Sequence, residues 1–272
     1  MMNATELESK ARWVWRETLK LHALCQETRI ASSLSCAEIL VALYYGGVLR
    51  FDPKEPLWEG RDRFVISKGH GSISFYPILA DLGFFDPAEL QRPGLPGALL
   101  KAIPDPHIPG YETVNGSLGH GIGVAAGMAL GLKAKKSGSA VFVLAGDGEL
   151  YEGAMWEGVM FAGHQRLSNL CVIVDNNRQC MLDYCRNVLD LSPLGAKFEA
   201  FGWEALEVDG HDLGALLPAL ESAKRLGRKK PLVIIANTIK GRGVPNLEGQ
   251  PLCHIFNVKA DDVAKLVREE SR

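Results

Sequence analysis

Five short runs of apolar, largely β-branched residues constrain the fold of this chain more than any other feature. They occupy residues 64–67, 140–145, 170–175, 205–208 and 232–236. The stretches around them carry helical patterns, at residues 5–28, 36–46, 72–82, 118–136, 153–165 and 213–225. Parallel strands require crossover connections, which helices usually supply. The alternation therefore predicts an α/β fold, with a mostly parallel sheet and helices on both faces.

The chain is expected to form one domain over residues 1–272, because a single α/β domain of this length is common. The longest interruption is the segment 92–110, which is rich in proline and glycine. We interpret this segment as a long irregular loop, and loops of that length in compact domains are usually functional or mobile.

Composition excludes several classes of partner. Thirty Lys and Arg residues balance 32 Asp and Glu residues, so the sequence predicts no basic surface for nucleic acid or an anionic membrane. The longest nearly apolar stretch, 121–132, is shorter than the roughly 20 residues that span a bilayer. The six cysteines form no C-x-x-C pair, and the charged N-terminus lacks the apolar core of a signal peptide. We therefore expect a cytoplasmic protein with reduced thiols.

Polar, glycine-rich peptides follow each of the five predicted strands. They are SKGHGS, GDGELYEG, DNNRQ, DGHD and NTIKGRG, in chain order. In open parallel sheets, ligands bind outside the carboxyl ends of the strands. The sequence therefore predicts one binding site along that edge.

Asp147 and Asn177 are the candidate metal ligands among these peptides. Asp147 lies between two glycines after one strand, and Asn177 follows the next strand. One carboxylate, one amide and a nearby backbone carbonyl supply oxygen ligands, and Mg²⁺ commonly completes such a set with phosphate and water. A Gly-Asp-Gly tripeptide can also be a plain turn, because these residues dominate turns.

The GDG and NN motifs, taken with others in the same order, resemble the N-terminal, diphosphate-binding half of transketolase. The resemblance covers residues 17–254 and includes SLSCAEILVALYYGGVLRFDP, RDRFVISKGHGS, GSLGHGIGVAAGMALGL, FGWEALEVDGHD and NTIKGRGV. It implies the thiamine diphosphate-binding fold, with thiamine diphosphate and Mg²⁺ as cofactors.

The resemblance also implies a role for each matching residue. The implied metal ligands are Asp147, Asn177 and the main-chain carbonyl of Gln179. The implied cofactor contacts are Ser32, His70, Gly116, Ser117, Leu118, Gly148, Lys240 and His254. The implied catalytic residues are His254, His70 and Glu152, the last in a proton relay across a subunit interface.

Three positions depart from the family pattern. Arg29 stands where transketolases commonly have a histidine that contacts donor-sugar hydroxyls, and a guanidinium favours carboxylate, phosphate or sulfonate over hydroxyls. Arg29 could instead form a salt bridge with Glu27, Glu38 or a residue of a partner chain. His107 is the only candidate for a second substrate-binding histidine, and His120 stands where the best-known transketolases have glutamine. The first two departures put the ordinary pentose-phosphate substrate in doubt and leave cofactor binding intact.

The resemblance implies one subunit of a two-component enzyme. The pyrimidine-binding and C-terminal domains of transketolase are expected on a separate chain, in a heterotetramer with two copies of each subunit. The expected reaction is transfer of a two-carbon ketol unit from a ketose or ketose phosphate to an aldehyde. The alternatives are an acyloin-forming or decarboxylating enzyme that acts on a 2-oxo acid or sugar, and a non-catalytic binding protein.

Overall fold

A five-stranded, fully parallel sheet forms the centre of the fold in the computed structural model, which describes residues 2–114 and 116–270. The strand order is β1-β2-β3-β5-β4. The strands are β1 (Arg63–Ile66), β2 (Val141–Gly146), β3 (Leu170–Asn176), β4 (Glu204–Asp209) and β5 (Leu232–Asn237). All five predicted strands are present, each within two residues of its predicted bounds.

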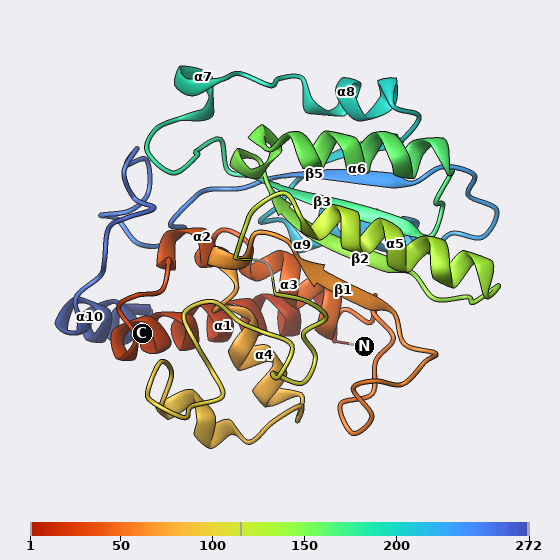
Figure 1. Cartoon of the computed structure of the whole chain (residues 1–272). Helices are drawn as coiled ribbons and strands as arrows, with labels where there is room; N and C mark the ends of the chain where they lie inside the picture. The colour runs from red at the N-terminus through yellow and green to blue at the C-terminus, as the bar shows by residue number, and fades with distance from the viewer. Residues whose placement is uncertain (1, 115, 271–272) are drawn as a thin grey trace.

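Helices cover both faces of the sheet (Figure 1). The α-helices are α1 (Ala4–Leu24), α2 (Ile30–Leu34), α3 (Ala37–Tyr45), α4 (Phe75–Asp81), α5 (Gly121–Ala134), α6 (Gly153–His164), α7 (Cys185–Val188), α8 (Leu194–Ala200), α9 (Leu213–Ser222) and α10 (Ala260–Glu270). Three short 3₁₀ helices are η1 (Gly69–Gly71), η2 (Pro87–Gln91) and η3 (Gly148–Tyr151). The predicted α/β class, with helices on both faces of a parallel sheet, is confirmed.

The alternation of side chains along the strands divides the core into two layers. In β2, Phe142 and Leu144 pack with α1, α3, α4 and α9, whereas Val141, Val143 and Ala145 pack with α5 and α6. All five side chains are fully buried. Strands that are covered on both faces read as continuous apolar runs, which is why these segments stand out in the sequence.

The predicted helices differ from the observed ones mainly at their ends. The first is expected over 5–28 but ends at Leu24, because the chain turns where Thr28 donates its hydroxyl to the carbonyl of Cys25 at 2.8 Å. The sequence patterns miss α2, α7 and α8, which have seven residues or fewer, and the polar, amphipathic α10. Residues 92–110 contain no helix or strand, as the loop prediction requires, and the irregular chain continues over 111–114 and 116–120. The helix expected over 118–136 begins later, at Gly121, and ends at Ala134.

His22, in α1, links the first helix to the C-terminal segment through a hydrogen bond. The ring is fully buried; its Nδ1 contacts the hydroxyl of Thr28 at 2.8 Å, and its Nε2 accepts from the backbone N–H of Val258 at 3.1 Å. Burial and the nearby charge of Arg29 lower the pKa of His22 to about 4, so the ring is neutral and can accept this bond. The contact holds the chain just beyond His254 against the helical layer.

Within the described residues, no helix is long and apolar enough to cross a membrane.

Candidate active site

A cavity of about 390 Å³ opens at the carboxyl edge of the sheet, where the sequence predicts a site. Its wall combines segments that follow β1, β2, β3 and β5. The predicted site residues that line it are Ser32, His70, Leu118, Asp147, Gly148, Glu152, Asn177, Gln179, Lys240 and His254. The fold thus gathers residues that lie up to 222 positions apart in the sequence, such as Ser32 and His254.

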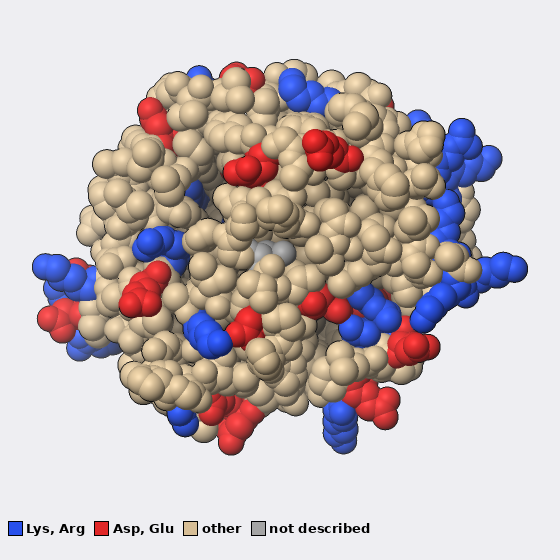
Figure 2. All heavy atoms as spheres, in the orientation of Figure 1, with Lys and Arg blue, Asp and Glu red and all other residues tan. Residues whose placement is uncertain are grey.

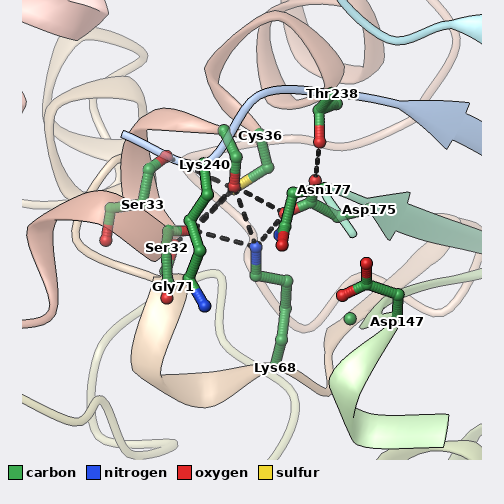
Figure 3. A network of polar contacts seen from close by, with 12 residues as sticks. Ser32, Ser33, Cys36, Lys68, Gly71, Asp147, Asp175, Asn177, Thr238 and Lys240 are labelled. Carbon is green, nitrogen blue, oxygen red and sulfur yellow. Dashed lines mark hydrogen bonds and ion pairs between the residues drawn. The ribbon is translucent and has the colours of Figure 1, made fainter. Parts of the chain in front are cut away.

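A buried ion pair joins Lys68, which lines the cavity, to Asp175 behind it (Figure 3). Asp175, in β3, is fully buried, and Lys68, just after β1, is 6% exposed. The carboxylate also accepts hydrogen bonds from the hydroxyls of Ser35, at 2.6 Å, and Thr238. The ammonium group donates to the backbone carbonyl of Ser32 at 2.8 Å. The pair therefore connects the ends of three strands to the segment around α2.

Charge pairing outweighs burial at both members of this pair. Burial alone would raise the pKa of Asp175, but the ion pair with Lys68 and the hydroxyl donors hold it below its usual value. Burial alone would lower the pKa of Lys68, yet the carboxylate of Asp175 raises it. Both groups are charged at neutral pH, and each supplies the compensation that a buried charge requires.

The three predicted metal ligands lie on two adjoining turns. Asp147 is 6% exposed, and its carboxylate accepts from the backbone N–H of Gly148, at 2.7 Å, and of Arg178. The amide oxygen of Asn177 accepts from the backbone N–H of Gln179 at 3.2 Å. Burial and the nearby charge of Asp175 raise the pKa of Asp147 to about 7, although the two backbone N–H donors and the charge of Lys240 oppose this shift.

This donor set fits Mg²⁺ rather than a softer metal. It consists of a carboxylate, an amide oxygen and a backbone carbonyl, which are hard oxygen donors. No group of three His, Cys, Asp or Glu side chains in the described part of the chain could hold a metal ion by itself. A cation bound here would therefore depend on further oxygen ligands from phosphate or water. Gly148 favours a close approach to the turn, because a Cβ there would lie 3.1 Å from the Cα of Cys180.

Lys240 places a second buried cation beside this turn. It is 4% exposed, and its ammonium donates to the backbone carbonyls of Cys180, at 2.6 Å, and Gln179, at 3.1 Å. Burial lowers its pKa. Figure 3 shows the Lys240 side chain running beside the Lys68 network without joining it. Its position suits an anion that would approach the metal turn.

Two imidazoles lie close together in the cavity wall. The rings of His70 and His254 have centroids 6.1 Å apart, and Nδ1 of His254 lies 3.0 Å from the hydroxyl of Ser32. Burial and the charge of Lys240 lower the pKa of His254 to about 3, and burial and Arg29 lower the pKa of His70. Both rings are therefore neutral near pH 7, and each keeps one N–H donor and one acceptor nitrogen.

The predicted residues at the front of the cavity are more open. Gly116 is half-buried, Ser117 is exposed, and Leu118 alone of the three lines the cavity. Glu152 is exposed at the start of α6 and lines the cavity. An exposed carboxylate at the cavity mouth can contact a second chain.

The three positions that depart from the family pattern lie in different parts of the structure. Arg29 directly precedes α2 and lies close enough to His70 and His254 to affect both. His107 does not line the 390 Å³ cavity: it contacts Asp105 at 2.9 Å, is largely exposed, and lines a separate cavity of about 300 Å³. His120 is exposed and precedes α5.

Sequence reasoning misses several cavity residues. The sequence alone leaves Lys68 as either a solvated cation or a functional one, and the structure buries it in an ion pair. Glu149 and the apolar rim have no sequence assignment; that rim comprises Met181, Leu182 and Val188, which are 54%, 54% and 55% exposed. The available signal is position, since Lys68 directly follows one predicted strand and Glu149 lies four residues after another.

Comparisons with known proteins agree with this geometry. Residues 30–270 match the family model of the transketolase thiamine diphosphate binding domain. The chain is 39% identical over 268 residues to one of the subunits of apulose-4-phosphate transketolase from Actinobacillus succinogenes, a match that covers 97% of this chain and 95% of that protein. It is 37% identical over 250 residues to the 6-deoxy-6-sulfo-D-fructose transketolase subunit SqwG of a Clostridium species, a match that covers 92% of this chain and 90% of that protein.

A solved structure gives the same result for the fold. Transketolase from Campylobacter jejuni superposes with a TM-score of 0.89 at 29% identity, and covers 99% of this chain. The chain spans 43% of the length of that transketolase. This chain therefore belongs to the transketolase family, a family of transferases, and carries its thiamine diphosphate-binding domain. The predicted family and fold class are confirmed.

Removal of one member of the Lys68–Asp175 pair should be strongly destabilising. Lys68→Met or Asp175→Asn leaves one buried charge without its partner, so each is expected to lower the free energy of unfolding by about 3–5 kcal/mol. The double variant should recover part of that loss, because it removes both charges. Urea unfolding of the four proteins measures this coupling. Lys101→Met, which breaks the exposed pair with Asp105, is the control and should cost under about 1 kcal/mol. A loss at Lys68 no larger than at Lys101 would contradict the assignment.

Proposed function

We propose that this chain is the diphosphate-binding subunit of a two-subunit, thiamine diphosphate- and Mg²⁺-dependent transketolase. It would transfer a two-carbon ketol unit from a ketose or ketose phosphate to an aldehyde. One observation carries the proposal: the carboxyl edge of the sheet brings the hard oxygen donors, Lys240, and the His70–His254 pair around one cavity. We also propose that the enzyme acts in the cytoplasm.

In this proposal, the metal turn and Lys240 together bind the diphosphate. Asp147, Asn177 and the carbonyl of Gln179 would hold Mg²⁺, and the ammonium of Lys240 would balance the remaining phosphate charge. The cofactor, when bound, supplies an electron sink for the carbanion that carbon–carbon cleavage leaves. The protein binds, orients and desolvates the reacting groups.

The neutral imidazoles provide the hydrogen-bonding groups for the substrate end. His254 is oriented by Ser32, and His70 faces it from η1. A neutral imidazole can donate to a hydroxyl or phosphate oxygen and can accept a proton. We therefore assign His254 to contacts with both cofactor and substrate, and His70 to the cofactor. Gly116, Ser117 and Leu118 are proposed to lie beside the aminopyrimidine, and Glu152 to take part in a proton relay with a second chain.

A partner subunit with the pyrimidine-binding domain is the second part of the proposal. Relatives that match this chain over most of their length are named as transketolase subunits. The outer face of α5 and α6 exposes apolar side chains, among them Val124 (41%), Leu130 (38%), Met160 (53%) and Phe161 (41%). In Figure 2 the surface over these helices is mostly uncharged. Exposed apolar surface of this kind marks a protein interface, and we propose a heterotetramer with two copies of each chain.

Arg29 favours a second candidate function, an acyloin-forming or decarboxylating activity on a 2-oxo acid or an acidic sugar. Within the described residues, the Arg29 guanidinium has no hydrogen-bond or ion-pair partner, and Glu38 lies against His211 at 3.1 Å instead. An available guanidinium beside the two histidines suits an anionic substrate group.

His107, by contrast, faces another cavity, so a substrate role for it would require a different position of its loop.

The metal assignment predicts a loss of cofactor binding on substitution of Asp147. Asp147→Ala removes the only carboxylate of the proposed metal site, so Mg²⁺-dependent thiamine diphosphate affinity should fall by about 100-fold or more, roughly 2.7 kcal/mol. Calorimetry on the reconstituted two-subunit enzyme measures it. Asp190→Ala, which removes an exposed carboxylate, is the control and should keep the wild-type affinity. Wild-type affinity in Asp147→Ala would refute the metal site, and no Mg²⁺-dependent binding in the unmodified enzyme would favour a non-catalytic role.

The proposed division between two chains predicts that this chain alone is inactive in ketol transfer. In this proposal the chain supplies only one side of the cofactor site, and the pyrimidine-binding domain of the partner supplies the other. Turnover should appear when a partner with a pyrimidine-binding domain is added, and sedimentation should then give a 2:2 complex. Turnover by this chain, with any co-purified partner excluded by mass spectrometry, would contradict the proposal.

Arg29→His tests which donor the enzyme accepts. If Arg29 contacts the substrate, the ratio of kcat/KM between a ketose phosphate and a 2-oxo acid should change by about tenfold or more, roughly 1.4 kcal/mol. The change should favour the ketose, because imidazole suits hydroxyl groups. Steady-state kinetics of the reconstituted enzyme on both donors provide the measurement. An equal loss on both donors with a lower Tm would assign Arg29 to structure and leave the ordinary transketolase substrate as the better choice.

A further inference from the structure

Glu149 is a buried carboxylate that the proposed chemistry does not use. It lies in η3, directly after the metal turn, and is 2% exposed. Acidic side chains are almost never buried to this degree unless their oxygens are fully paired. The partners of Glu149 therefore indicate what it does.

Three donors from three segments converge on this carboxylate. Oε1 accepts from the hydroxyl of Ser67, at 2.5 Å, and from the backbone N–H of Gly119, at 2.9 Å. Oε2 accepts from the backbone N–H of Gly146 at 3.1 Å. Ser67 follows β1, Gly146 ends β2, and Gly119 belongs to the loop before α5.

The loop before α5 packs closely against the end of β1 and the start of α6. Gly119 has φ +86°, and a Cβ on it would lie 2.6 Å from the Cβ of Glu152. A Cβ on Gly121 would lie 2.3 Å from the hydroxyl of Ser67. Leu118, next to Gly119, lines the cavity. A shift of the Gly119 amide would therefore move a wall of the cavity.

We propose that Glu149 is a positioning residue that fixes the loop 116–120 against the metal turn and so sets the width of the cofactor cavity. The effect of Glu149 on cofactor binding rests on the proposed function, whereas the effect of Glu149 on the loop does not. One carboxylate serves both parts of the cavity, because one oxygen binds the loop and the other binds the residue before Asp147.

A carboxylate suits this task better than an amide. An ionised carboxylate only accepts hydrogen bonds, and all three partners of Glu149 are donors. Glutamine has nearly the same shape, but its NH₂ group would face at least one of these N–H or O–H donors. Glu149→Gln should therefore weaken the arrangement without leaving a cavity, and Glu149→Ala should abolish it.

Hydrogen exchange on the purified full chain tests the loop directly. In Glu149→Ala, amide exchange within 116–120 should accelerate by about tenfold or more, because the Gly119 N–H loses its acceptor. Glu149→Gln should give a smaller acceleration in the same segment. Glu221→Ala, an exposed carboxylate on α9, is the matched control and should leave exchange there unchanged. Unchanged exchange in both Glu149 variants overturns the proposal.

Kinetics of the reconstituted enzyme distinguish positioning from general stability. A displaced loop should raise KM for thiamine diphosphate by about tenfold in Glu149→Gln, the scale typical of residues that orient a site from behind. A purely structural loss would lower Tm and kcat per mole of protein with KM unchanged, and that result overturns the proposal. Failure of the unmodified enzyme to bind thiamine diphosphate would refute the proposed function, and hydrogen exchange would still decide the role of Glu149 in the loop.

Discussion

The buried Lys68–Asp175 ion pair determines how the carboxyl edge of the sheet is built. A carboxylate at the end of a central strand, with no access to water, must be paired, because an unpaired buried charge is very costly. Asp175 obtains its partners from the end of β1, the segment after β5 and the chain near α2. Satisfying one charge thus aligns four segments, and these segments carry Ser32, His70, Asn177 and Lys240.

Two further buried charges, on Asp147 and Lys240, determine the electrostatics of the cavity. Lys68 and Asp175 compensate each other, but Asp147 and Lys240 form no ion pair with one another and bind backbone groups instead. The raised pKa of Asp147 and the lowered pKa of Lys240 reflect charges held without full compensation. A divalent cation at Asp147 and a diphosphate near Lys240 would compensate both, which is why the proposed function accounts for the electrostatics as well as for the geometry.

The sequence predicts the scaffold of this site better than its interior. Apolar strands that end in glycine-rich peptides are local patterns, so β1 to β5 and the residues that follow them could be located. Whether Lys68 is exposed or buried depends on Asp175, 107 positions away, and no local pattern specifies that pairing. Glu149 escapes prediction for the same reason. The short helices α2, α7 and α8 form through tertiary contacts rather than through a long amphipathic pattern.

The inner wall and the outer rim of the cavity are built differently, and this difference suits a site that a second chain completes. The inner wall is fixed by buried, fully paired groups, namely the Lys68–Asp175 pair and the three-donor contact of Glu149. The outer rim, by contrast, exposes Met181, Leu182 and Val188, and the α5–α6 face is apolar. A preorganised inner wall lowers the cost of ordering when a partner docks, and apolar rim surface supplies the driving force and excludes water. On this reasoning, under the proposed two-subunit arrangement, the chain would hold its part of the cofactor site in shape before a partner docks, and docking would contribute mainly the groups and the water-free environment that the open side lacks.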